Sequence, residues 1–114
     1  MKLALATLAT LATALTLSSP AAFAGDAGTT AIEALGKVNG IALACQQPAV
    51  ASRARNALVT TAPKTRANGE IFENATNAAY LEQGKGVACP DAATLANLVG
   101  AAEKGLQSAF SGAR

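Results

Sequence analysis

The sequence contains no histidine. Histidine is the commonest general base in catalysis and a frequent ligand for zinc, copper and haem iron, so its absence removes the usual Ser-His-Asp and Cys-His nucleophile pairs. Tryptophan is also absent, and the chain has three phenylalanines and one tyrosine. No C-x-x-C-H haem attachment, glycine-rich phosphate loop or EF-hand loop occurs. We therefore expect no catalytic residue, no metal and no cofactor, and a protein that is not an enzyme.

The sequence also lacks strand patterns. No segment shows the strict alternation of apolar and polar residues, or the β-branched enrichment, that is typical of strands. Apolar residues instead recur at steps of three and four, and a capping-box pattern of Thr30 with Glu33 opens the first such segment. The prediction is an all-α fold, a small bundle of four short helices. These helices are expected at about 30–46, 48–62, 69–83 and 90–110.

Residues 1–24 have the parts of a cleavable signal peptide. Lys2 gives the positive start, residues 3–17 form an apolar run without charge, and an Ala-x-Ala site ends at Ala24. A permanent membrane anchor needs about 20 apolar residues, and this run is shorter and diluted by threonine. We expect cleavage between Ala24 and Gly25, no stable membrane anchor afterwards, and a periplasmic or secreted protein.

The remainder, residues 25–114, is predicted to form a single helical domain that contains two cysteines, Cys45 and Cys89. Two thiols in an exported protein usually pair. Redox-active pairs of the C-x-x-C type have two residues between the thiols, whereas these lie 44 positions apart. We expect a structural disulfide that ties the end of the first helix to the start of the fourth.

Small residues form a stripe at steps of four in the first predicted helix: Gly36, Gly40 and Ala44. Interior glycines cost a helix about 1 kcal/mol each relative to alanine, so we expect the stripe to allow unusually close approach of another helix. That helix can belong to the same chain or to a second copy. A homo-oligomer formed through these three residues is therefore one hypothesis.

Charge is segregated along the chain. Cleavage would remove Lys2 and lower the net charge from +2 to +1, and with so small an excess no nucleic-acid partner is expected. Between Glu33 and Glu70 every charged residue is basic. One interpretation is a site for an anion or an acidic partner on the second helix and the Pro63–Gly69 loop. The alternative is a solvated face that pairs with the acidic third helix. The candidate binding residues are Arg53, Arg55, Lys64 and Arg66.

Together these features favour a small exported non-enzymatic binding protein that uses its basic helix and loop to bind another, acidic, protein. One alternative is a periplasmic stress chaperone or a protein of the inhibitor or immunity type. A third hypothesis is a small hydrolase that uses Glu70 and Glu73, but a solvated helix face explains these carboxylates better. Phe72 and Tyr80 are expected to pack in the core rather than to anchor a partner.

Overall fold

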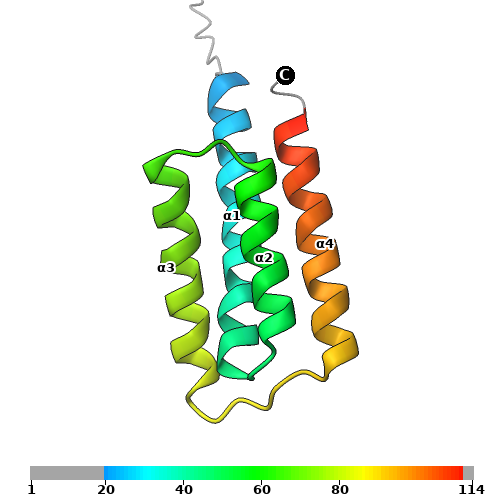
Figure 1. The fold of residues 1–114 in the computed structure, drawn as a ribbon. Coiled ribbons are helices and arrows are strands. Elements are labelled where there is room, and N and C mark those ends of the chain that lie inside the picture. The colour runs from blue at the N-terminus through cyan, green and yellow to red at the C-terminus, as the bar shows by residue number, and fades with distance from the viewer. Residues whose placement is uncertain (1–19, 112–114) are drawn as a thin grey trace, which may run out of the picture.

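The computed structural model describes residues 20–111, and over this range the chain forms four α-helices and no strand (Figure 1). The predicted all-α fold with four helices is confirmed. The first 19 residues of the predicted signal peptide lie outside the described part of the chain, and its last residues, 20–24, begin the first helix. The helices are α1 (Pro20–Ala44), α2 (Pro48–Thr61), α3 (Arg66–Gln83) and α4 (Ala92–Ser111).

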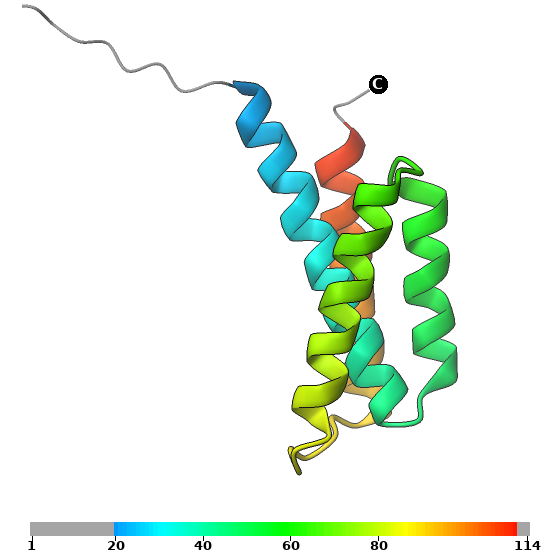
Figure 2. The same ribbon diagram turned by 90° about the vertical axis from the view of Figure 1, so that its left-hand side faces the viewer.

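Helix α1 lies at the centre, and the other three helices pack on it. Figures 1 and 2 show α3 and α4 on opposite sides of α1, with α2 across a third side. Helix α2 also contacts α4, whereas α3 approaches only α1 among the described helices. Because α3 and α4 lie apart, one side of α1 stays open between them. The largest fully buried side chains are Ile32, Leu35, Leu95, Val99 and Leu106.

The structure places the start of α1 at Pro20 rather than at Thr30. Thr30 therefore lies inside the helix, and its predicted role in a capping box is wrong. Residues 21–29 contain four alanines, which favour a helix, and no proline that would end one. A proline is tolerated in the first turn, where its missing N–H is not needed.

Helix α3 starts at Arg66, so the predicted Pro63–Gly69 loop is shorter than expected. The side chain of Thr65 caps the helix by accepting a hydrogen bond from the Asn68 N–H at 3.1 Å. The Asn68 amide in turn donates to the carbonyl oxygen of Pro63 at 2.9 Å. In the sequence, the glycine at 69 was a stronger signal for the start of this helix than Thr65. In the structure, the hydroxyl of Thr65 sets the start because it satisfies an otherwise unpaired backbone N–H.

Helix α4 is capped by Asp91. Its carboxylate accepts the Thr94 N–H at 2.7 Å, and its carbonyl oxygen accepts the Leu95 N–H at 3.0 Å. The hydrogen bond from the Thr94 backbone, with a further one to the Thr94 side chain, holds the pKa of the Asp91 carboxyl below its ordinary value of 3.8. The charged carboxylate is therefore the form that stabilises the start of α4.

We expect Asp91→Ala to lower the midpoint of urea unfolding modestly at pH 7, because the first turn of α4 loses its cap. Since the pKa of Asp91 is lower in the folded state than in the unfolded chain, its contribution is complete above pH 3.8 and is lost as the pH falls through the folded value. The difference in midpoint between the variant and the parent protein should therefore shrink as the pH is lowered below 3.8. A difference that is constant with pH would contradict the assigned cap.

Helices α1 and α3 approach closely at Gly36 and Gly40. A methyl group added to Gly36 would lie 2.6 Å from the carbonyl oxygen of Phe72, and one added to Gly40 would collide with the carbonyl oxygen of Thr76 and lie 2.8 Å from the Cβ of Ala79. These glycines are therefore needed for contact inside one chain. The sequence left open whether these glycines contact a helix of the same chain or of a second copy. The structure shows the contact within one chain.

A polar contact fixes the register of the same two helices. Asn39 is only 3% exposed, and its amide nitrogen donates to the hydroxyl of Thr76 at 3.1 Å. That hydroxyl donates to the carbonyl oxygen of Gly36 at 3.2 Å. Because these partners match at one register only, a slide of α3 along α1 would leave buried polar groups unpaired. The amide oxygen of Asn39 is itself buried without a partner among the described residues.

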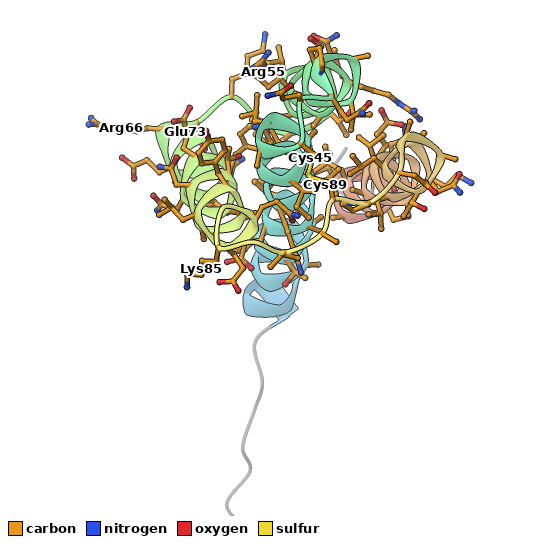
Figure 3. All side chains as sticks on the ribbon, turned by 90° about the horizontal axis from the view of Figure 1, so that it is seen from below. Cys45, Arg55, Arg66, Glu73, Lys85 and Cys89 are labelled. Carbon is orange, nitrogen blue, oxygen red and sulfur yellow. A yellow bond between two sulfur atoms is a disulfide. The ribbon has the colours of Figure 1, made fainter. Side chains whose placement is uncertain are left out.

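The predicted disulfide between Cys45 and Cys89 is confirmed, with an S–S distance of 2.03 Å and a Cα–Cα distance of 5.8 Å. Cys45 directly follows α1, and Cys89 lies in the segment before α4. Figure 3 shows the two residues together at this end of the bundle. The bond therefore connects the end of α1 to the start of α4, and it is compatible with an oxidising compartment.

Candidate functional site

Two of the four predicted basic site residues are engaged in ion pairs. Arg53 donates from Nε and Nη2 to the two carboxylate oxygens of Glu103 on α4, each at 2.8 Å. This hydrogen bonding, together with the charge of Glu103, raises the pKa of Arg53. Arg66 pairs with Glu70 one turn along α3 at 3.2 Å. Arg53 thus pairs with α4 and not with the acidic third helix, because α2 lies against α4 and not against α3.

The other two predicted residues, Arg55 and Lys64, are exposed and form no ion pair with a residue in the described range. Figure 3 shows Arg55 and Arg66 directed outward from different helices. Arg53 lines a shallow pocket between α2 and α4, while Lys64 lies in the α2–α3 loop. The four residues therefore cover a broad outer surface and do not converge on one pocket.

The carboxylates considered for hydrolysis lie on the solvent side of α3. Glu70 and Glu73 are both exposed, and Glu70 is paired with Arg66. Over residues 20–111, no group of three or more potential metal ligands is arranged to hold an ion. Within the same range, none of the helices has both the length and the apolar character needed to cross a membrane.

An apolar groove of about 1030 Å³ lies between α1 and α4, on the open side of α1. The sequence did not predict this groove. Its floor is formed by Ala31, Val38 and Ala102, which are buried. Nine of the lining side chains are alanine, glycine, serine or threonine, which explains why a wide groove remains between two packed helices. The lining residues are Ala27, Thr30, Ala31, Ala34, Lys37, Val38, Ile41, Leu98, Ala101, Ala102, Gly105, Ser108 and Ala109.

Lys37 is the single charged residue among those that line this groove. It is exposed and forms no ion pair with another described residue. Lys37 also lines a smaller groove of about 620 Å³ on the other flank of α1, where Glu33 and Glu82 lie. The lysine thus stands on α1 between two shallow depressions, in the middle of the surface that α3, α1 and α4 form together.

Large apolar side chains are exposed at a few positions. Leu98, 40% exposed, lies on the wall of the α1–α4 groove. Tyr80 is 49% exposed, so the expectation that it packs in the core is wrong, whereas Phe72 is buried as expected. Tyr80 lies on the flank of α3 because Ala79, its neighbour, is the residue that packs against Gly40.

No protein-family model matches this chain, and no curated protein or solved structure matches it either.

Proposed function

We propose that this protein is a small exported binding protein without enzymatic activity, and that it holds a segment of a partner protein in the groove between α1 and α4. The observation that carries this proposal is the groove itself, an exposed apolar surface that extends over two neighbouring helices. Exposed apolar patches of this kind mark interaction sites in soluble proteins. Export is supported by the signal-peptide pattern of residues 1–24 and by the Cys45–Cys89 disulfide.

Both walls of the groove are held in place. Helix α1 is fixed by its close contact with α3 at Gly36 and Gly40. Helix α4 is held by its buried side chains Leu95, Val99 and Leu106, and the pair between Arg53 and Glu103 links it to α2. A binding surface that is ordered before the partner arrives loses less conformational entropy on association. This rigidity supports a binding role for the groove.

Site-specific photo-crosslinking in the source cells tests this proposal. A photoreactive amino acid at Ala101, in the groove, should yield one discrete cross-linked protein, and the same amino acid at Asn77, exposed on α3, should not. The purified cross-linked partner should then bind the purified mature protein. Gly105→Trp should abolish both results, because no atom lies within 4 Å of a Cβ at Gly105 and the indole can fill the groove.

Equal cross-linking from Ala101 and Asn77, or undiminished binding by Gly105→Trp, would overturn the assignment of the groove. Circular dichroism and the thermal midpoint show whether Gly105→Trp keeps its fold.

A second candidate site is the outer basic surface, since Arg55 and Lys64 are exposed and without an ion pair among the described residues. Reversing Arg53 would be a poor test, because it also breaks the contact with Glu103. The double variant Arg55→Glu and Lys64→Glu leaves that contact intact. Loss of the partner in this variant, with binding retained in Gly105→Trp, would favour the basic surface over the groove.

A further inference from the structure

We propose that the segment bound in the α1–α4 groove is an amphipathic α-helix of about four turns that carries a carboxylate opposite Lys37. This inference rests on the proposed function and names the partner chemistry of the same site. Three observations support it: the spacing of the residues on the two walls, the size of their side chains, and the single charge.

The residues on the rim of the groove have the spacing of a coiled-coil seam. On α1 they recur at alternating steps of three and four, and on α4 they do the same. A helix laid along the groove would therefore meet the α1 seam along its length and the α4 seam over about 15 Å of it. The α1 seam covers 14 residue steps, which at 1.5 Å per step is about 21 Å, or about four helical turns. The seams are Ala27, Thr30, Ala34, Lys37 and Ile41 on α1, and Leu98, Ala101, Gly105 and Ser108 on α4.

The size of the lining side chains favours a helix over a small molecule. Sites for small ligands enclose most of the ligand surface, whereas this groove is open along its length. Alanine, glycine and serine on a helix surface allow the backbone of another helix to come close. The incoming helix would supply large apolar side chains at steps of three and four, which is the usual pattern of helix-in-groove recognition.

Lys37 sets the charge of the partner. Covering the groove with a helix would remove water from the ammonium group of Lys37, which is unfavourable unless an opposite charge accompanies it. A carboxylate at the edge of the apolar stripe of the partner would supply that charge. Because Lys37 is the one charged lining residue, it also fixes where along the partner helix the carboxylate must lie.

Two other occupants of the groove would not supply this carboxylate. The predicted leader contains no aspartate or glutamate in residues 1–24, so it has no carboxylate to place opposite Lys37. A second copy of the folded domain carries the same lysine and no carboxylate among its own groove residues, so two copies paired through this surface would leave Lys37 without an opposite charge. A separate protein with a free acidic amphipathic helix is the occupant that the groove fits.

Designed peptides test this inference on the mature, disulfide-bonded protein. An 18-residue amphipathic helix with leucines at steps of three and four, and one glutamate at the centre of the stripe's edge, should bind, as measured by calorimetry. The same peptide with lysine in place of that glutamate should bind at least tenfold more weakly. Lys37→Glu should reverse this preference, and Lys104→Glu, exposed on α4 but outside the groove, should leave it unchanged.

The outcomes separate this inference from the proposed function. Binding of both peptides with equal affinity, or a preference that Lys37→Glu does not reverse, would overturn the acidic-helix partner while the groove remains the site. If palmitate bound more tightly than the peptide and displaced it, the ligand of the groove would be an anionic lipid and the acidic-helix partner would likewise be overturned. Peptide binding that survives in Gly105→Trp, together with partner binding that survives there, would overturn both.

Discussion

Replacing Gly36 and Gly40 together by alanine is expected to lower the free energy of unfolding by about 4 kcal/mol. Overpacking of a tight interface costs about 1–3 kcal/mol per site, and here the added methyl groups meet backbone carbonyl oxygens of α3, which cannot rotate away. We therefore use about 3 kcal/mol per site. The better helix propensity of alanine returns about 1 kcal/mol at each position. Urea denaturation followed by circular dichroism measures the difference.

Gly105→Ala is the matched control for this prediction. It makes the same substitution in the interior of a helix, but no atom lies within 4 Å of the added Cβ. Only the propensity of alanine then acts, so this variant should be more stable than the parent protein by up to about 1 kcal/mol. If all three glycine positions tolerated alanine equally well, the close contact between α1 and α3 would be wrong.

Removing the disulfide with Cys45→Ser and Cys89→Ser is expected to cost about 4 kcal/mol. The bond closes a loop between residues 44 positions apart, and restricting the unfolded chain over such a loop is worth about 4 kcal/mol on the chain-entropy model. For a domain of this size the thermal midpoint should fall by about 20 °C. Differential scanning calorimetry of the oxidised protein and of the variant gives this shift directly.

Reduction supplies an independent check of the same bond. Dithiothreitol should lower the thermal midpoint of the parent protein to that of the double serine variant, and it should have no effect on the variant. The two results together show that the stability comes from the covalent link and not from packing of the sulfur atoms. A parent protein whose midpoint is insensitive to the reductant, and equal to that of the variant, would contradict a stabilising disulfide.

The sequence predicted the features that depend on local pattern. The apolar stripe of α4, with Leu95, Val99 and Leu106, is buried as its spacing indicates. The pairing of Cys45 with Cys89 was predicted from two facts about the sequence: it has two thiols, and its first residues have the pattern of an export signal. Helix starts were less accurate, because one cap such as Thr65 can outweigh a nearby glycine in choosing where a helix begins.

The features that the sequence did not predict depend on which helices are neighbours. The sequence contains several acidic residues that could pair with Arg53. Only the packing of α2 on α4 selects Glu103 as the partner. The groove likewise exists because α3 and α4 lie apart, leaving the small residues of α1 and α4 uncovered. The alternating steps of Ala101, Gly105 and Ser108 can be read from the sequence. They form a groove only because the small residues of α1 lie beside them, and the sequence does not show that packing.

The walls of the groove come from α1 and α4, the first and the last of the described helices, so the groove forms only when both ends of the domain are present. A chain that crosses a membrane from its N-terminus delivers α1 first and α4 last. No partly translocated chain, and no fragment that ends before α4, contains both walls. Under the proposed export and groove binding, the protein would therefore become able to bind its partner only after α4 has arrived and folded.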